Sequence, residues 1–447
     1  MKTFSKTCVA AALLLASFAQ AEARQWTLGD CVNYALANNI SLKKTKVQQL
    51  TALEDVKQSQ AALLPSLDFS TSQNITYRPW PESGRQTVAN GYVQSSVDKT
   101  YYNGSYSVSG NWTVWNGGRN TNQVKLNKLT EQQAVLDSAQ TANNILEQIA
   151  QLYVQILYSN EAIKVNKSSL ETSKANEERG KTMVGVGKMS KADLAQLTSQ
   201  RAQDEYNIVE AESNLRNYKR QLKQLLQITN DDEFDVAVPE ATDAMALEAV
   251  PALNDVYTAT IEHRPEIKAA QLGVESSDLS LKIAKAQRMP TIGLNLGVAT
   301  NTTSMSNDAW GSQMKTNFNV GGGVTLSIPL FDNRSSKTAA NKAMLQRESY
   351  MLDMKDKQTT LYSTVENYWL QAVTKQNKFK AAQVSTQSAQ VSYDLLSEQF
   401  RLGLKNIVEL MTGKDNLLKA QQNELQSKYL AILNLNMLNF YKTGELK

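Results

Sequence analysis

Two stretches of the chain carry the same residue pattern, which predicts a fold built from two similar halves. At a constant offset of 225, Leu28, Asp30, Leu36, Leu42, Lys43, Lys57 and Pro65 match Leu253, Asp255, Ile261, Ile267, Lys268, Lys282 and Pro290. Farther along, Val186-Gly187 and Asp193-Leu194 match Leu402-Gly403 and Glu409-Leu410 at an offset of 216. Unequal loops between the landmarks account for the change of offset.

Each half is expected to contain a helix, a strand pair and a long helical hairpin, in that order. The halves span 24–235 and 253–447, and the hairpins turn near 185–188 and 402–405. Between the halves, 236–252 is acidic and bears two prolines, so it is predicted to be a connector.

Residues 1–23 have the pattern of a secretory signal peptide, with Lys2 and Lys6 before an apolar run and small residues at the expected cleavage site. The apolar run is too short to span a bilayer. Because Cys8 lies within this segment, only Cys31 stays in the exported chain, and no disulfide can form within one molecule.

Charge and composition exclude several classes of function. The chain has 47 basic and 43 acidic residues, a net charge of +4, which argues against a nucleic-acid surface. Its single histidine, His263, offers neither a metal site nor a nucleophilic triad. GVGKMS (185–190) lacks the Ser or Thr of a phosphate-binding loop and lies between helices. We therefore predict neither an enzyme nor a cofactor.

Four segments change from a helical period to strict alternation, which is typical of strands with one apolar face. They are 66–77, 102–114, 291–300 and 317–330. In the first, Leu67, Phe69, Ile75 and Tyr77 alternate with polar residues, and aromatic residues gather near the strand ends. Transmembrane barrel strands show this pattern, and so do half-buried strands of a soluble sandwich.

Four strands cannot close a membrane barrel, because the smallest has 8 strands and an open sheet leaves unpaired edges in lipid. If the strands span a membrane, several chains must each contribute four. At least a dimer is required, and a trimer would give 12 strands.

Long heptad patterns predict paired helices after each strand pair. In 335–400 the apolar positions recur at alternating spacings of four and three, as in coiled coils, with interruptions at Lys375 and Thr386. Segments of about 60 residues would extend roughly 90–100 Å. Their other faces are rich in Gln, Asn, Ser and Thr, which suits either a solvated surface or the wall of a water-filled tunnel.

Taken together, these features resemble the TolC-like outer-membrane efflux proteins, also called outer membrane factors, over nearly all of the exported chain. Further markers are the helix-to-strand junctions at Pro65 and Pro290 and the segments 115–119 (WNGGR) and 331–334 (FDNR). These last two are similar to the family's aromatic-D-G-G-R return from barrel to helix.

The resemblance implies a mixed α and β membrane protein. A homotrimer would form a 12-stranded β-barrel in the outer membrane, continuous with a coiled-coil α-barrel in the periplasm. The connector and the C-terminal segment would form an equatorial region. The implied function is a passive exit duct of a tripartite efflux or type I secretion system, with a periplasmic adaptor and an inner-membrane transporter as partners.

The resemblance also implies site residues. Adaptor-docking tips would lie at Val186, Gly187, Lys188, Leu402, Gly403 and Leu404, and a periplasmic pore constriction at Asp193, Lys405 and Glu409. Lys188, Phe400 and Thr412 depart from the residues usual in the family, where an apolar residue, a hydrogen-bonding tyrosine and a second acid occur.

Two other hypotheses fit parts of the sequence. A soluble periplasmic or surface coiled-coil scaffold with a small β-domain would show the same helices and strand alternation. An exported enzyme would need a polar catalytic cluster, which the sequence does not offer.

Overall fold

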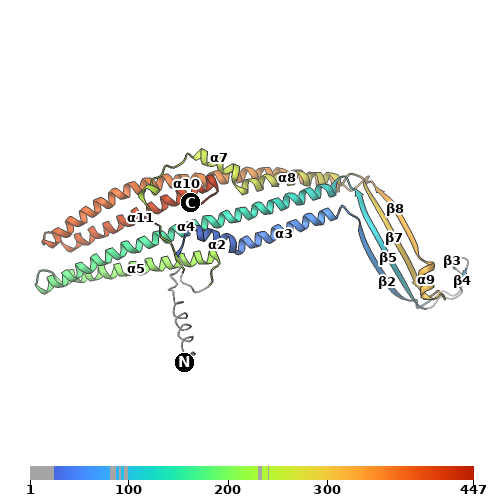
Figure 1. Cartoon of the computed structure of the whole chain (residues 1–447), viewed down its shortest axis with the longest axis horizontal. Helices are drawn as coiled ribbons and strands as arrows, with labels where there is room; N and C mark the ends of the chain where they lie inside the picture. Colours follow the sequence, from blue (N-terminus) through green and yellow to red (C-terminus); the bar gives the residue numbers. More distant parts are fainter. Residues whose placement is uncertain are drawn as a thin grey trace, which may run out of the picture. The chain divides into compact units, whose positions relative to one another are not determined.

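A computed structural model describes residues 25–80, 87–89, 92–94, 99–229, 234–239 and 241–446. The predicted signal peptide, 1–23, lies outside them. The chain forms two compact units (Figure 1). Among the described residues, the hairpin unit contains 25–47, 136–269 and 355–446, and the sheet unit contains 48–135 and 270–354. Each half of the duplication contributes to both units, so the sequence repeats are not the compact units.

The first half of the chain contains these elements in order: β1 Gln25–Trp26, α2 Leu28–Asn38, α3 Ile40–Ala61, β2 Ser66–Tyr77, β3 Thr87–Ala89, β4 Tyr92–Gln94, β5 Thr100–Trp115, α4 Arg119–Gly185 and α5 Lys191–Leu226. The rest contains β6 Asp235–Val236, α6 Asp243–Ala246, α7 Leu253–His263, α8 Pro265–Ala286, β7 Thr291–Thr303, α9 Trp310–Thr316, β8 Asn319–Ser327, α10 Ser335–Arg401 and α11 Ile407–Thr443.

The sheet unit is organised around one antiparallel four-stranded sheet with the order β2-β5-β7-β8. The central pairing, β5 with β7, joins the two halves of the duplication. β2 and β8 are the edge strands of the sheet. Within the described part of this chain, β2 pairs only with β5 and β8 pairs only with β7. The expectation of strand over 317–330 is too long, since β8 ends at Ser327, two residues before Pro329, which has no backbone N–H for a ladder.

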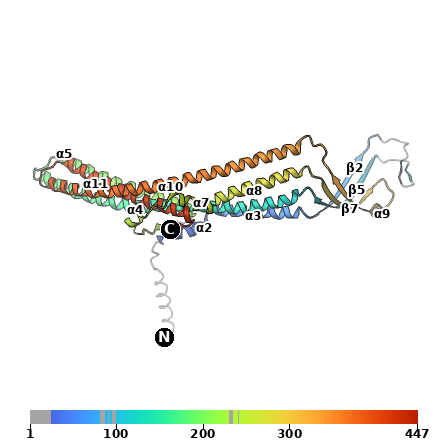
Figure 2. The ribbon, with the colours of Figure 1, turned by 90° about the horizontal axis from the view of Figure 1, so that it is seen from above.

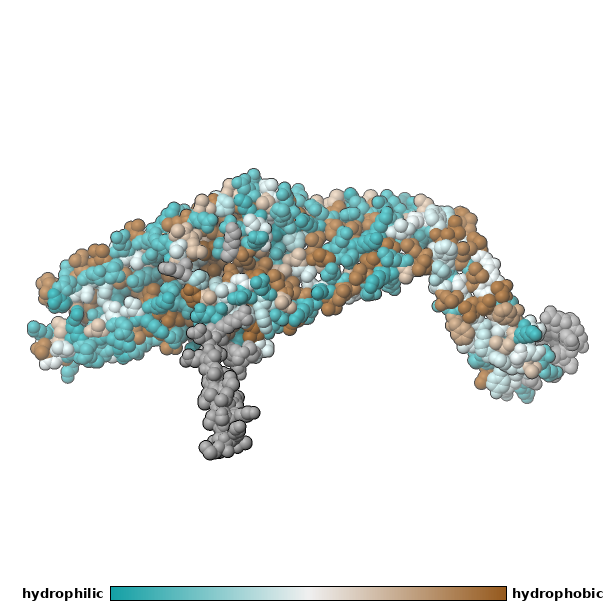
Figure 3. All heavy atoms as spheres, viewed as in Figure 1, coloured by the Kyte–Doolittle hydropathy of each residue, from teal (hydrophilic) through white to brown (hydrophobic). Residues whose placement is uncertain are grey.

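The two faces of the sheet differ in chemistry. Leu67, Phe69 and Val324 are 77%, 69% and 70% exposed. Phe69 of β2 lies directly opposite Val108 of β5, so the side chains of Phe69 and Val108 lie on the same apolar face. The other face carries small polar residues, with hydroxyl–hydroxyl bonds of 2.7 Å between paired serines at 70/107 and 72/105. Hydrophobic residues cover much of the sheet surface visible in Figure 3.

The hairpin unit contains two helical hairpins, in which α4 lies beside α5 and α10 beside α11 (Figures 1 and 2). Its core joins both halves of the chain: Ile149 and Ile156 on α4, Leu222 on α5 and Met437 on α11 are fully buried in one cluster. The predicted heptad face of α10 is confirmed, because Val365, Ala372 and Phe379 are fully buried.

The first helix of each half is split where the sequence predicts one helix. Asn39 separates α2 from α3, and Arg264, at the matching position 225 residues later, separates α7 from α8. Both have extended backbone. Pro265 disfavours helix at Arg264, and the Asn39 side chain instead donates 2.9 Å to the Leu225 carbonyl.

The connector is a packed part of the hairpin unit and not a bare linker. β6 pairs in parallel with β1, and Val236 and Ala246 are buried. The Tyr153 hydroxyl donates 2.7 Å to the Ala237 carbonyl, which ties the connector to α4. Helix α9 lies between β7 and β8, and His263 is exposed at the end of α7.

Candidate functional site: the hairpin tips and the polar link behind them

The first tip, residues 186–190, reverses the chain between α4 and α5 with a glycine in the left-handed region. Gly187 has φ of +69°. Its N–H donates 3.0 Å to the Val184 carbonyl, and the Lys188 N–H donates 2.8 Å to the Met183 carbonyl. This pair of bonds is the Schellman arrangement that satisfies the last carbonyls of a helix. The glycine of the sequence pattern therefore has a local backbone reason.

The second tip, residues 402–406, repeats that geometry 216 residues later. Gly403 has φ of +74°, its N–H donates 3.0 Å to the Phe400 carbonyl, and the Leu404 N–H donates 2.9 Å to the Gln399 carbonyl. Any other residue at Gly403 would be strained, although nothing lies within 4 Å of a Cβ there. The duplication thus extends to single hydrogen bonds.

Each outgoing helix begins with a capped first turn, and the predicted constriction acids form part of the caps. The Ser190 hydroxyl accepts 3.0 Å from the Asp193 N–H and donates 2.8 Å to its carboxylate. Asn406 accepts 2.9 Å from the Glu409 N–H, and the Glu409 carboxylate accepts 3.2 Å from the Asn406 N–H. The second pair is a capping box. The spacing Ser-x-x-Asp and Asn-x-x-Glu could have indicated these caps from the sequence.

The structure brings two of the three predicted constriction residues together. Lys405 Nζ lies 2.6 Å from Glu409 Oε1, and both side chains are 38% exposed. Lys405 and the Asn406 N–H stabilise the charged carboxylate, which lowers the pKa of Glu409. Among the described contacts Asp193 bonds within its own hairpin only. The Lys405–Glu409 pair is neutral as a whole, so Glu409 is not a bare negative charge.

The predicted docking residues lie at the exposed ends of the hairpins. Val186, Leu402 and Leu404 are 66%, 60% and 71% exposed, and Gly187, Lys188 and Gly403 are exposed as well. Nothing in the turn geometry requires large apolar side chains at these positions. Exposing these apolar side chains to water is unfavourable in free energy, and no contact within the described part of the chain compensates for it. Such exposure is typical of a surface that binds another molecule.

Two of the three departures from the family pattern, Phe400 and Thr412, have different local roles. Phe400 is buried in a cluster with Leu197, Tyr393 and Ile407, so its ring stabilises the hairpin pair. Thr412 is exposed and lines a groove of about 320 Å³ between α10 and α11, next to Glu409.

Behind the tips, the two helices of each hairpin approach closely at one glycine–leucine contact. The glycine lies on the first helix of the first hairpin and on the second helix of the second hairpin. A Cβ at Gly180 on α4 would lie 2.7 Å from Leu197 on α5. In the second hairpin, a Cβ at Gly413 on α11 would lie 2.7 Å from Leu396 on α10. Since 396 matches 180 and 413 matches 197 at the offset of 216, the small and large partners are interchanged.

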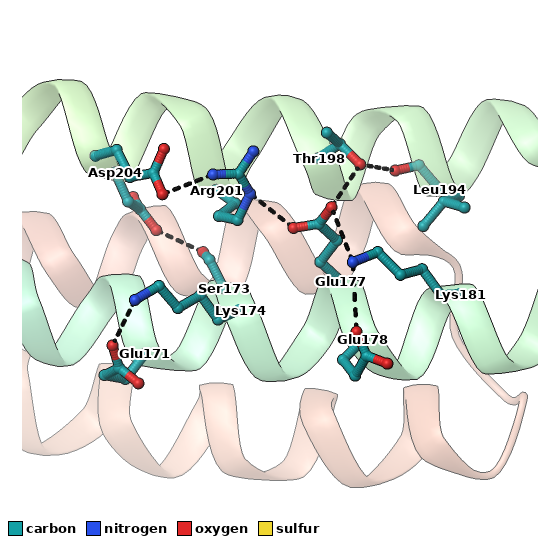
Figure 4. Close-up of polar contacts among 11 residues, drawn as sticks. Glu171, Ser173, Lys174, Glu177, Glu178, Lys181, Leu194, Thr198, Arg201 and Asp204 are labelled. Carbon is teal, nitrogen blue, oxygen red and sulfur yellow. Dashed lines mark hydrogen bonds and ion pairs between the residues drawn. The ribbon is translucent and has the colours of Figure 1, made fainter.

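A buried ion pair joins the two hairpins, and sequence reasoning missed it. Asp204 on α5 contacts Lys414 on α11, and their side chains are 1% and 6% exposed. The Ser173 hydroxyl on α4 donates to the same carboxylate (Figure 4). Three helices therefore meet at one carboxylate.

A second network holds the first hairpin together closer to its tip. Glu177, which is 8% exposed, accepts 2.7 Å from Arg201 and 3.2 Å from Thr198 (Figure 4). Lys181 lies 3.6 Å from the same carboxylate. These contacts link α4 to α5 across positions that apolar residues could occupy.

A signal for the inter-hairpin pair is present in the sequence. Leu197, Asp204 and Ile208 follow heptad spacing on α5, and Leu410, Lys414 and Leu417 do so on α11. Opposite charges at apolar heptad positions on two helices indicate a buried pair. The partner of each charge can be assigned only once the helices are placed side by side.

Comparison with known proteins decides the family. The family model described as outer membrane efflux protein matches residues 31–227 and 256–441. The chain belongs to the outer membrane efflux protein family. It is 23% identical over 408 residues to the toxin and drug export protein A of Aggregatibacter actinomycetemcomitans, covering 91% of this chain and 83% of the relative. The outer membrane protein TolC of Salmonella enteritidis is 20% identical over 418 residues, covering 90% and 78%.

Solved structures share the fold of this chain. The outer membrane protein VceC of Vibrio cholerae superposes with a TM-score of 0.76 at 16% identity, covering 92% of this chain and 95% of that one. The expected resemblance to TolC-like efflux proteins is confirmed, and this member of the family is an outer-membrane efflux protein.

Two further findings concern the described part of the chain. None of its helices combines the length and apolar composition needed to cross a bilayer. No three His, Cys, Asp or Glu residues of that part gather closely enough to hold a metal ion.

Burial raises the pKa of the Cys31 thiol to about 12, which keeps it protonated and unreactive.

Proposed function

We propose that this outer-membrane efflux protein is the passive exit duct of a tripartite efflux or type I secretion system. The observation that carries the proposal is the four-stranded sheet. It has an exposed apolar face and a face of serines and asparagines. Each strand pair is followed by a helix of 67 residues, α4 or α10, which pairs with the next helix of the chain. An apolar outer face suits lipid, and a hydroxyl-rich inner face suits a water-filled passage.

The duct is a homotrimer. The sheet has two free edges, β2 and β8, and free edges in lipid leave backbone groups without partners. Pairing β8 of one copy with β2 of the next removes every edge, and three copies of the four-stranded sheet give a 12-stranded barrel. The two hairpins of each copy supply four helices, so the same trimer gives a 12-helix α-barrel in the periplasm.

A periplasmic adaptor docks on the tips, and through it the duct works with an inner-membrane transporter. The exposed Val186, Leu402 and Leu404 support this assignment, together with the two tight glycine turns that hold them at the ends of the hairpins. The flanking Lys188 adds a positive charge to the first tip. It distinguishes the two tips chemically, and the adaptor meets each with a different surface.

The periplasmic constriction lies at Lys405 in the second tip and at Asp193 and Glu409 in the first turns of the helices that follow the tips. Three symmetry-related copies of each residue form a ring, in which each Lys405–Glu409 pair is neutral and each Asp193 carboxylate keeps its negative charge, bonded to Ser190. Thr412 supplies a hydroxyl where relatives have a second acid. In this constriction Glu409 is therefore compensated by its ion pair, and the net negative charge comes from Asp193.

A soluble coiled-coil scaffold is the second candidate, and the exposed apolar sheet face argues against it. Fractionation with native mass spectrometry tests the proposal. The full chain is expected in outer membranes, to need detergent for extraction, and to run as a trimer that conducts ions in planar bilayers. A monomer that stays soluble without detergent would refute the duct.

A further inference from the structure

A second site lies in the hairpin unit, in a groove of about 590 Å³. Its wall is rich in side-chain amides, and one lysine stands among them: Gln148, Gln151 and Gln155 on α4, Gln221 on α5, and Gln371 and Lys375 on α10. No acidic residue lines it. Its volume falls within the range of pockets that hold small organic ligands, roughly 300–1,000 Å³.

The amides form an ordered wall because of their helical spacing. Gln148, Gln151 and Gln155 are three and four residues apart, which puts them on one face of α4. In the described part of the chain, the side-chain amides of Gln148, Gln155, Gln221 and Gln371 have no hydrogen-bond partner within the protein. Each is free to donate and to accept, so a bound polar group meets several donors at once.

Lys375 is the residue that makes the groove selective for charge. It interrupts the heptad of α10 at a position where an apolar residue is expected, and it lies one turn after Gln371. It is half-buried, and none of the acidic side chains that the structure describes lies within ion-pair distance of it. A half-buried ammonium group without a counter-ion attracts an anion.

The rest of the groove is lined by apolar side chains and by Asn434. Leu152, Leu430 and Leu433 line it, and Leu433 is 8% exposed within the main core cluster. Tyr368 presents a ring there. The groove therefore offers a cation and amides together with aliphatic and aromatic side chains.

We propose that this groove binds amphiphilic organic anions, in particular aromatic carboxylates or sulfonates. The carboxylate pairs with Lys375 and accepts from the neighbouring amides, and the ring packs on the leucines. The inference goes beyond the duct function, because a passive duct needs no binding site along its wall. It gives the chain a preference for one class of solute, independent of its partners.

Equilibrium dialysis of the purified full chain in a neutral maltoside detergent tests the site. The probes are 2-naphthoate and its uncharged analogue 2-naphthamide. We expect 2-naphthoate to bind at millimolar concentration or below and 2-naphthamide to bind about tenfold more weakly. Lys375→Gln should weaken 2-naphthoate by a similar factor and leave 2-naphthamide unchanged.

The matched control is Lys378→Gln, which removes an exposed lysine from the same helix without touching the groove. Its affinity for 2-naphthoate should equal that of the parent. Equal binding of the two probes, or of parent and Lys375→Gln, would overturn the proposal.

Oligomeric state and thermal unfolding of Lys375→Gln complete the test. If that variant loses its assembly or melts early, Lys375 pairs with a carboxylate of another copy and the ligand site is wrong. Channel activity in planar bilayers is measured separately. A protein that conducts but does not bind 2-naphthoate refutes the site and leaves the duct intact.

Discussion

Removing the charge of Asp204 tests whether the buried ion pair holds the two hairpins together. Asp204→Asn keeps the shape of the side chain but leaves Lys414, 6% exposed, without its anion. Breaking a buried pair from one side costs about 3–5 kcal/mol. The lysine can escape its charge by releasing a proton, which costs about 4.6 kcal/mol at pH 7 for an ordinary lysine. The loss should therefore lie between about 3 and 4.6 kcal/mol.

Hydrogen exchange measured by mass spectrometry gives this free energy locally, in peptides from α5 and α11 around the pair. At 1.4 kcal/mol per factor of ten, exchange should accelerate roughly 100- to 2,000-fold after correction for intrinsic rates. Releasing the proton costs only about 1.9 kcal/mol at pH 9, so the defect should shrink on going from pH 7 to pH 9. A cavity or a lost hydrogen bond would show no such trend.

The double variant Asp204→Leu with Lys414→Met separates the pair from its packing. Two apolar side chains of similar volume replace the ions without leaving a charge, which is often neutral for stability. The Ser173 hydroxyl can donate to a carbonyl of its own helix instead. Lys419→Met, at an exposed position of α11, is the control. The reasoning fails if the double variant exchanges as fast as Asp204→Asn, or if Asp204→Asn stays within threefold of the parent.

Three further predictions concern the tips. Leu404→Glu puts a charge on a side chain that is 71% exposed without changing the glycine turn, so efflux in cells should fall at least tenfold while trimers form normally; unchanged efflux would remove this tip from docking. Glu409→Gln leaves Lys405 unpaired, so planar-bilayer recordings should show lower cation selectivity, whereas Lys405→Gln should raise it; equal selectivity in both would place the pair away from the constriction. The pKa of Glu409 is lowered in the fold, so its stabilisation of the first turn of α11 is complete above about pH 5 and is lost as the pH falls through the folded value. Hydrogen exchange of that turn between pH 6 and pH 3 should show the loss, and Glu409→Gln should abolish its pH dependence.

The strands illustrate what alternation can and cannot predict. β2 has the bounds expected from its alternating residues, because a period of two leaves little choice of backbone. β5 and β7 extend beyond the expected ranges, and β8 is shorter. Their ends depend on how far each neighbour continues to pair, and that information is not local. For the same reason, we did not predict helix α9, which lies between β7 and β8.

The splits at Asn39 and Arg264 follow from tertiary contacts as well as local rules. Pro265 gives a signal for the break before α8, whereas α2 and α3 form one continuous helical pattern in the sequence. Asn39 leaves the helix to bond with a carbonyl of α5, 186 residues away. A helix-period argument has no access to such a partner.

At the site, the glycine pattern predicted the turns, but not what the acids do there. Glu409 suggested a carboxylate ring by resemblance, and the fold shows it bonded to Lys405 and Asn406. Asp204 and Lys414 were not singled out from the sequence, and the fold shows them as one buried pair. Lys375 interrupts the heptad of α10, and its neighbours make it part of a groove.

The sequence by itself determined the duplication, the apolar and polar faces of the strands, the long helices and the glycine turns, because each depends on residues close together along the chain. Only the tertiary structure decided which charges are paired and which stay free. Pairing depends on distances between helices more than 200 residues apart in sequence, as for Asp204 and Lys414. It also depends on burial, which makes an ion pair decisive in the core and weak at the surface.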